Sequence, residues 1–271
     1  MATNEREIKA IFYNIYNGAV NKRDAISKYI RTKHYSFAAF SELNKFSDSS
    51  FQKWASSELE LDYTEFLETP HGFHLGIASR YKMQLIKSDV DHPLHHGYIL
   101  VKIDELDLHV LVTHLCPSTA MQRLEETNHI IDTLSCMNLL TEHVMLVGDL
   151  NTLSSRDVIK SDTTRLLAAN SKLTAKFLRE DNDGHLSIDF RPMDTLLKEL
   201  IDTGTPNDNS VPTNILEDKM HATEMRLDYG LVTKALWKAC NGKVHSKTLK
   251  STETAELSDH YPLEIILQLT Q

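Results

Sequence analysis

The stretch Gly148-Asp149-Leu150-Asn151 follows a short apolar run at residues 143–147, and Ser258-Asp259-His260-Tyr261-Pro262 precedes another apolar run at residues 263–269. Together the two stretches supply two carboxylates, an imidazole and a carboxamide, each beside a predicted strand. These groups can hold a divalent cation beside a phosphate and direct a water molecule at the phosphorus. The pair therefore indicates a metal-dependent site at the ends of strands.

The composition is that of an ordinary globular chain of 271 residues, 41% hydrophobic, without Gly/Ser-rich or Pro-rich runs that would mark a linker. We therefore predict a single domain spanning residues 1–271, with one sizeable core. The net charge of −9 disfavours tight, sequence-independent binding of duplex nucleic acid through its phosphates. A bound cation would offset part of that charge if the acidic residues form a site.

The three cysteines, Cys116, Cys136 and Cys240, lack a Cys-x-x-Cys spacing, which favours reduced thiols in the cytoplasm or nucleus. The first residues are polar and lack the apolar segment of a signal peptide. No apolar run approaches the ~18 residues of a membrane span. We therefore expect an intracellular protein without a membrane span, and no protein partner can be inferred from the sequence.

Apolar runs typical of strands alternate with segments of helical periodicity. Strands are expected at residues 8–13, 35–40, 73–79, 81–86, 97–103, 108–113, 143–147, 226–232 and 263–269. Helices are expected at residues 21–32, from residue 117 onward, and from 155 to about 178. The second of these helices has Met121, Leu124, Ile131 and Leu134 on one face and Glu125 and Glu126 on another. Because a hairpin joins 97–103 to 108–113, two stacked mixed sheets flanked by helices fit better than one parallel sheet.

Polar side chains stand where the predicted strands stop: Asn14, Glu42, His114, Asp149 with Asn151, Asp228, and Asp259 with His260. Taken singly, each of these residues is more often a turn or cap residue. Strand ends that converge on one rim of a sheet, however, bring residues that are far apart in sequence into one site. As a set with the two quoted stretches, they favour a functional site.

These residues stand in motifs that resemble the endonuclease/exonuclease/phosphatase superfamily, which shares the DNase I-like fold. The motifs are Tyr13-Asn14-Ile15, Phe40-Ser41-Glu42, Thr113-His114-Leu115, Gly148-Asp149-Leu150-Asn151, Arg226-Leu227-Asp228-Tyr229 and Ser258-Asp259-His260-Tyr261-Pro262. They occur in the order of that family from residue 14 to residue 262, nearly the whole chain. The resemblance implies a four-layered α/β sandwich, in which two packed mixed sheets are flanked by helices, with a metal-dependent phosphoesterase site on one rim.

The resemblance also implies roles. Glu42 is the first expected Mg²⁺ ligand, with Asp259 and Asn14 completing or orienting the shell and Mn²⁺ as a substitute ion; hard oxygen ligands suit Mg²⁺. Asp149 would orient or deprotonate the attacking water, and Asn151, with Asn14, would bind a phosphoryl oxygen. The pair His260 and Asp228 resembles the His-Asp pair of the family, in which the carboxylate fixes the imidazole tautomer. His114 would contact a non-bridging oxygen or assist the leaving group. Whether His260 acts as general base or as phosphate ligand stays open.

For the substrate, a phosphodiester such as nucleic acid ranks slightly above a small-molecule or lipid phosphoester, which would make the chain a phosphatase or phospholipase-type hydrolase. A non-catalytic binding protein on the same fold is a more distant alternative, since no motif carboxylate or histidine is missing. The Tyr that apurinic-site nucleases carry in the third motif is absent here, where Thr113-His114-Leu115 stands.

Two weaker signals remain. His92-Pro93-Leu94-His95-His96 has a spacing that could suit a zinc hydrolase, but a polar turn is the favoured interpretation, with a substrate-facing loop as a third. Arg80 is our candidate for a phosphate-binding arginine; Arg191 and Arg226 are others, although exposed arginines are more often surface charges.

Overall fold

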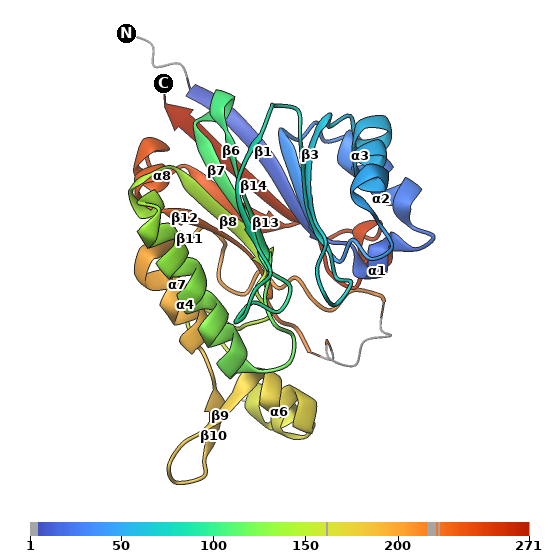
Figure 1. Cartoon of the computed structure of the whole chain (residues 1–271). Helices are drawn as coiled ribbons and strands as arrows, with labels where there is room; N and C mark the ends of the chain where they lie inside the picture. Colours follow the sequence, from blue (N-terminus) through green and yellow to red (C-terminus); the bar gives the residue numbers. More distant parts are fainter. Residues whose placement is uncertain (1–4, 161, 216–220, 222, 271) are drawn as a thin grey trace.

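The computed structural model describes residues 5–160, 162–215, 221 and 223–270, and its strands form two six-stranded sheets and one short hairpin (Figure 1). The strands of the first sheet are β1 (Glu5–Asn14), β2 (Phe37–Ser41), β3 (Tyr63–Leu67), β4 (Leu75–Ser79), β13 (Val244–Thr248) and β14 (Leu263–Thr270). Those of the second sheet are β5 (Gln84–Asp89), β6 (Tyr98–Ile103), β7 (Leu108–His114), β8 (Val144–Asp149), β11 (Leu200–Asp202) and β12 (Asp228–Thr233).

Both sheets are mixed. The strand orders are β13-β14-β1-β2-β4-β3 and β11-β12-β8-β7-β6-β5. Each sheet has one parallel pair, β1 with β2 and β7 with β8, and all other pairs are antiparallel. Every residue of β2, β7 and β8 is buried, because these strands are covered on both faces. That burial explains why they stand in the sequence as nearly continuous apolar runs.

Helices cover the outer faces of the sheets. The helices are α1 (Tyr16–Ala19), α2 (Arg23–Arg31), α3 (Asp48–Trp54), α4 (Ala120–Cys136), α5 (Thr163–Ala168), α6 (Ser171–Phe177), α7 (Arg191–Glu199) and α8 (Lys234–Ala239), with a π-helical segment at Ala55–Leu59. Residues of α2 and α3 share an apolar cluster with β1 and β2, whereas residues of α4 and α7 share another with β7 and β8. A third cluster, with members such as Phe12, Ile77, Val112 and Val147, fills the space between the sheets. The predicted four-layered sandwich is therefore confirmed (Figure 1).

A small extension projects beyond the sandwich at residues 153–190 (Figure 1). It consists of α5, α6 and the hairpin of β9 (Leu178–Glu180) and β10 (Leu186–Ile188). Its apolar residues, such as Leu167 and Phe177, form a fourth cluster together with Val211 and Leu227. We predicted one helical stretch from residue 155, which was wrong. Helix α5 begins only at Thr163, and Asn170 starts a separate helix because its side chain accepts hydrogen bonds from the main-chain N–H groups of the next helix, at Lys172 and Leu173.

Every strand expected from the sequence is present, with ends shifted by at most three residues. The strands that we did not predict have weaker patterns. In β13, for example, the buried positions are Val244, Ser246 and Thr248, so polar residues fill two of the three inward positions. Strand β3 is an edge strand with half-exposed side chains. Apolar periodicity is a poor guide to both kinds of strand.

The buried face of α4 differs from the predicted one. Met121 is 53% exposed, whereas Arg123 and Glu126 have no exposed surface. The helix begins after Thr119, whose side chain accepts a hydrogen bond from the main-chain N–H of Gln122. The two buried charged residues bond to main-chain groups of the loops beside the site, which is why the hydrophobic pattern did not reveal this face.

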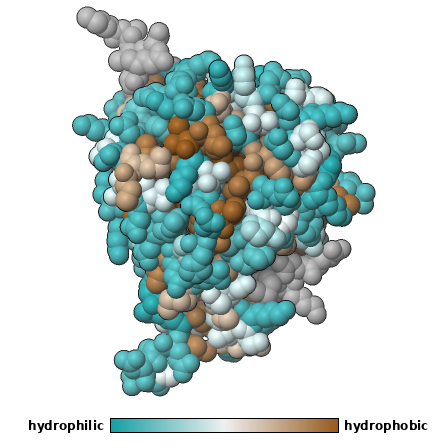
Figure 2. Space-filling model, in the orientation of Figure 1, coloured by the Kyte–Doolittle hydropathy of each residue, from teal (hydrophilic) through white to brown (hydrophobic). Residues whose placement is uncertain are grey.

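The surface is mostly hydrophilic on the face shown in Figure 2, with hydrophobic side chains gathered in a band between the positions of β6 and β3 in Figure 1. Leu67, Tyr81 and Met83 are partly buried against the core between the sheets. Among the described residues, no helix is both long and apolar enough to cross a bilayer. All three cysteines are free thiols; the intracellular location stays a prediction.

The two parallel pairs bring their carboxyl ends to one rim of the sandwich. Asn14 at the end of β1 pairs with Ser41, the residue before Glu42, and His114 at the end of β7 pairs with Asp149 at the end of β8. Strand β12 begins beside Asp149, with Asp228 as its partner. Strand β14 begins beside the end of β1, so the loop before it arrives at the same rim. The topology thus assembles residues from position 14 to position 260.

Candidate active site

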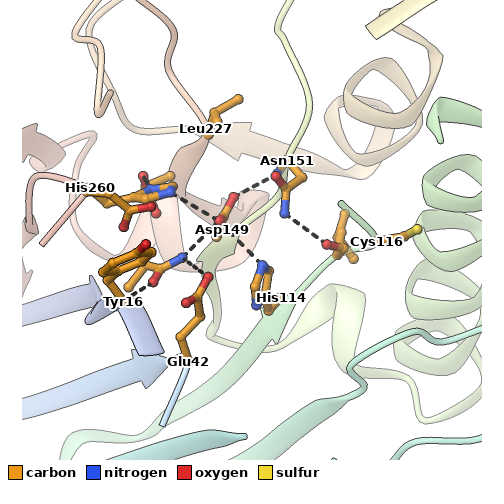
Figure 3. A network of polar contacts seen from close by, with 12 residues as sticks. Tyr16, Glu42, His114, Cys116, Asp149, Asn151, Leu227 and His260 are labelled. Carbon is orange, nitrogen blue, oxygen red and sulfur yellow. Dashed lines mark hydrogen bonds and ion pairs between the residues drawn. The ribbon is translucent and has the colours of Figure 1, made fainter. Parts of the chain in front are cut away.

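Asp149 is the centre of a polar network at this rim (Figure 3). Its Oδ2 atom accepts a hydrogen bond from Nδ2 of Asn14 at 3.1 Å and lies 3.5 Å from Nε2 of His114 and 3.6 Å from Nε2 of His260. Its Oδ1 atom accepts a hydrogen bond from the main-chain N–H of Asn151 at 2.9 Å. Burial raises the pKa of Asp149, but the charges of His260 and His114 outweigh burial and lower it overall. This carboxylate is therefore ionised at neutral pH.

Glu42 is held by a left-handed turn. All four residues of α1 have φ between 46° and 75°. The turn lets the main-chain N–H of Asn17 donate to Oε2 of Glu42 at 3.0 Å, while the N–H of Gly18 donates to the Glu42 carbonyl at 2.7 Å. Nδ2 of Asn14 donates to the other carboxylate oxygen at 3.2 Å. Glycine is required at position 18, since a Cβ atom there would lie 1.9 Å from the carbonyl oxygen of Asn44.

His260 is paired with a buried carboxylate. Its Nδ1 atom lies 2.7 Å from Oδ2 of Asp228, and its Nε2 atom faces Asp149. Burial lowers the pKa of the imidazole, but the carboxylates of Asp228 and Asp149 outweigh burial and raise it to about 10. Asp228 is fixed in turn, because its main-chain N–H donates to Oγ of Ser210. At neutral pH the ring therefore keeps a proton on both nitrogens, and the contact with Asp228 fixes its orientation.

His114 differs from His260, because no carboxylate among the described residues supports its ring from behind. Within the same residues its Nδ1 atom is buried without a hydrogen-bond partner, and burial lowers the pKa of the ring. Its ring stacks on that of His96, with centroids 4.5 Å apart and planes at 29°. The His96 ring also contacts the ring of Phe73, at 5.2 Å between centroids. Packing therefore orients His114.

These side chains line one cavity of about 350 Å³. The lining residues are Tyr16, Asn17, Glu42, Phe73, His96, His114, Pro117, Asp149, Asn151, Lys176, His221, Asp259 and His260. Asn14 and Asp228 stand behind this wall, bonded to Asp149 and to His260. All eight motif residues thus come together, although their roles stay proposals.

Arg80 is the exception among the predicted site residues. The register of β2 and β4 pairs Phe37 with Ser79, so Arg80 lies at the end of the first sheet opposite to Glu42. Its side chain is exposed and its Nε atom donates to the Tyr35 carbonyl. The prediction that Arg80 binds the phosphate at this site was therefore wrong. The two other arginines have carboxylate partners: Arg191 pairs with Asp189, and Arg226 with Asp157 and Asp202.

Seven of the lining residues were not among the predicted site residues, and three of these seven carry imidazole or ammonium groups: His96, Lys176 and His221. His96 belongs to the histidine-rich stretch at residues 92–96, which does not form the alternative zinc site. Within the described part of the chain, no set of three or more metal-ligating atoms includes His92, His95 or His96. The third interpretation of this stretch, a loop that faces the substrate, fits His96, because this residue is 1% exposed and lines the cavity. Nothing in the sequence marks Lys176 or His221.

The donor set fits a hard divalent cation. Glu42, Asp149 and Asp259 present carboxylates to the same cavity, and Glu42 has hydrogen bonds but no ion pair with any described Lys, Arg or His. Such oxygen ligands suit Mg²⁺. Asn14 was predicted to complete or to orient the metal shell, and its contacts fit the second role. Its Nδ2 atom donates to Glu42 and Asp149, while its Oδ1 atom accepts from the N–H of Tyr16. It orients the two carboxylates.

The buried His96 should make stability depend on pH. Burial and the neighbouring imidazoles of His114 and His95 hold the pKa of His96 well below its usual value, so only the unfolded chain takes up this proton near pH 6. Below a pH of about 6.5, stability must then fall with pH by about 1.4 kcal/mol per unit for this group. We expect His96→Phe to lose about 2 kcal/mol less than the parent protein between pH 7 and pH 5.

Urea unfolding at the two pH values measures this difference. The matched control is His245→Phe, at an exposed position of β13. Equal losses in the parent protein and in His96→Phe would contradict the interpretation.

Comparison with known proteins supports the fold. No protein-family model and no curated protein matches this chain. An AP endonuclease from Archaeoglobus fulgidus is similar in structure, at 15% sequence identity and a TM-score of 0.63, covering 96% of this chain and 99% of that chain. An endonuclease/exonuclease/phosphatase family protein from Bacteroides thetaiotaomicron has 11% identity and a TM-score of 0.60, covering 99% and 100%. A functionally unknown conserved protein from Enterococcus faecalis V583 has 14% identity and a TM-score of 0.61, covering 97% and 100%.

The chain therefore has the fold of the endonuclease/exonuclease/phosphatase proteins, as the motifs predicted. At these identities the likeness establishes the fold, not the substrate.

Proposed function

We propose that this protein is a divalent-metal-dependent phosphoesterase that hydrolyses a phosphodiester, in the manner of a nuclease, by in-line attack of water on phosphorus. The observation that carries the proposal is the meeting of three carboxylates, Glu42, Asp149 and Asp259, with the imidazoles of His114 and His260 in one cavity. Carboxylates alone suit a cation, whereas the combination suits a phosphate held beside a cation. The shared fold supports the same class of chemistry.

Asp149 orients the attacking water and accepts its proton in this proposal. Its Oδ2 atom lies among Asn14, His114 and His260, so a water molecule in the cavity can bond to it only from a narrow range of directions. Preorganisation of this kind lowers the entropic cost of bringing water to the phosphorus. Asn151 lines the cavity beside it; one N–H of its amide donates to the Leu115 carbonyl, and the other can bond to a phosphoryl oxygen.

His260 and His114 are the proposed imidazole ligands of the phosphate. Since Nδ1 of His260 is bound to Asp228, its Nε2 atom is the one directed toward Asp149 and the cavity. His114, at the end of the neighbouring strand β7, presents Nε2 to the same carboxylate. Donors fixed before the reaction stabilise charge that develops on the phosphoryl oxygens without reorganising.

Mg²⁺, or Mn²⁺ in its place, would be held by Glu42 and Asp259 and, when bound, would supply Lewis-acid stabilisation of the phosphoryl and leaving oxygens. Asn14 bridges the Glu42 and Asp149 carboxylates through its two Nδ2 hydrogen bonds and orients both. The complete set of groups in one cavity favours an enzyme over a binding protein on the same fold.

Hydrolysis of bis(p-nitrophenyl) phosphate tests the proposal. We expect p-nitrophenol release in the presence of Mg²⁺, loss of release with EDTA, and recovery when Mg²⁺ is added in excess. The monoester p-nitrophenyl phosphate, assayed in parallel, should be hydrolysed more slowly. Folded protein that cleaves only the monoester would be a phosphatase, and folded protein inactive on both esters with Mg²⁺ or Mn²⁺ would refute the proposal.

A further inference from the structure

Lys176 places a positive charge in the cavity. The residue belongs to α6, in the extension outside the sandwich, and is only 3% exposed although lysine is rarely buried. Its side chain lines the cavity with Asp149, His114 and His221. After burial and the charges of His260 and His114, Lys176 is the next influence on the pKa of Asp149, which it lowers. The ammonium group therefore lowers the pKa of Asp149, although Lys176 lies on α6, outside the six motifs.

The backbone of Lys176 is fixed to the strand end that carries His114. Arg123, a fully buried residue of α4, donates from its two terminal nitrogens to the carbonyl groups of Cys116, at 2.8 Å, and of Lys176. Glu126, on the same helix, accepts hydrogen bonds from the main-chain N–H groups of Cys116 and His95 at 2.8 and 2.7 Å. Helix α4 thus joins the end of α6 to the loop after β7.

Anchoring α6 in this way has a free-energy cost, because it buries two charged side chains. The guanidinium of Arg123 and the carboxylate of Glu126 are both removed from water, and both form hydrogen bonds with main-chain groups of loops around the site. A buried ammonium likewise needs compensating charge, and the carboxylate of Asp149 in the same cavity interacts with it. Lysine is a compact cation with three N–H donors and is a common phosphate ligand. Lys176 lines the same cavity as His114 and His260, the proposed imidazole ligands of the phosphate.

We propose that Lys176 is a catalytic residue that donates to a non-bridging oxygen of the substrate phosphate and stabilises the charge of the transition state, with Arg123 as its positioning residue. This inference rests on the proposed function, because it places the phosphate in the cavity between β1, β8 and α6. It extends the phosphate site beyond the motif residues to the extension at residues 153–190.

Two measurements on Lys176→Met test the inference, with Lys172→Met, an exposed position on the same helix, as matched control. The first is turnover of bis(p-nitrophenyl) phosphate with Mg²⁺, where we expect a loss of about 10²-fold in kcat, as for removal of one charge-stabilising donor. The second is calorimetric binding of inorganic phosphate with Mg²⁺, where we expect an affinity at least about 10-fold lower. Lys176→Arg should recover part of both.

The outcomes separate the inference from the proposed function. If Lys176→Met matches Lys172→Met in turnover and in phosphate affinity, the inference is overturned while the proposed function stands. If the parent protein binds phosphate through Lys176 but hydrolyses no ester, the contact is supported and the proposed function fails. If the parent protein neither binds phosphate nor hydrolyses the ester, both fail. Circular dichroism checks folding, and Lys176→Gln provides a second neutral variant should the methionine variant misfold.

Discussion

Asp149→Asn should lower kcat for phosphodiester hydrolysis by roughly 10²–10⁴-fold, the effect expected when a positioned acid-base group is lost. The substitution keeps the shape of the side chain but removes the negative charge and the oxygen that would take the proton from water. In the parent protein, Nδ2 of Asn14, Nε2 of His114 and Nε2 of His260 all face the Oδ2 atom of Asp149. The amide of the variant cannot accept from all three. Single-turnover kinetics with saturating Mg²⁺ separates this loss from weaker binding of metal.

The control for this variant is Asp132→Asn, an exposed carboxylate on α4. It changes the net charge by the same amount and should leave kcat unchanged. Activity of Asp149→Asn within about threefold of the parent protein would remove Asp149 from the centre of the mechanism.

Asp228→Asn should lower kcat by about 10²–10⁴-fold, although Asp228 stands behind the cavity wall and does not touch substrate in our proposal. The carboxylate is 2.7 Å from Nδ1 of His260 and is therefore the group that holds the proton on that nitrogen. An amide at this position carries no negative charge, so the pKa of His260 should fall and the ring should lose both its charge and its fixed orientation toward Asp149 and the phosphate. The expected loss is in kcat more than in KM.

A double-mutant cycle with His260→Asn is the decisive control for this prediction. If Asp228 acts only through His260, then Asp228→Asn should cost little more once His260 has been replaced. Independent, multiplicative losses from the two substitutions would show that Asp228 has another role.

The motif residues could be located from the sequence because strand ends carry them. A buried parallel strand is a mainly apolar run, and a polar residue stands at its carboxyl end, as with Asn14, His114 and Asp149. Register then brings the ends of neighbouring strands together without any need to know the loops. The fold and the centre of the site were predictable for this reason.

The rest of the cavity depends on packing between distant segments. Lys176 lies in a segment that was expected to be one long helix, and the hydrophobic periodicity of that segment does not indicate that its side chain lines the site. Arg123 and Glu126 are buried because they form hydrogen bonds with main-chain groups. In the sequence, two charged residues on a helix predict an exposed face instead. For Arg80 the error was the opposite one, because it was predicted to lie in the site. It lies at the far end of its sheet, where it cannot contact the phosphate.

His114 shows how the structure refines a transferred role. The sequence offered no partner for it, and the structure gives it a stacked imidazole, His96, in place of a supporting carboxylate. Two histidines of the site thus differ in environment, because one is paired with Asp228 and the other is held by packing. Such a difference in surroundings is how one site gives two imidazoles different tasks.

The most direct test of the central claim is nicking of supercoiled plasmid by the purified protein with Mg²⁺, beside an EDTA control and Asp149→Asn. We predict conversion of supercoiled to open-circular DNA that requires the metal and is lost in the variant. Well-folded protein that leaves the plasmid supercoiled, or that nicks it equally with EDTA or with Asp149→Asn, would contradict the assignment of a metal-dependent nuclease-type phosphodiesterase to this site.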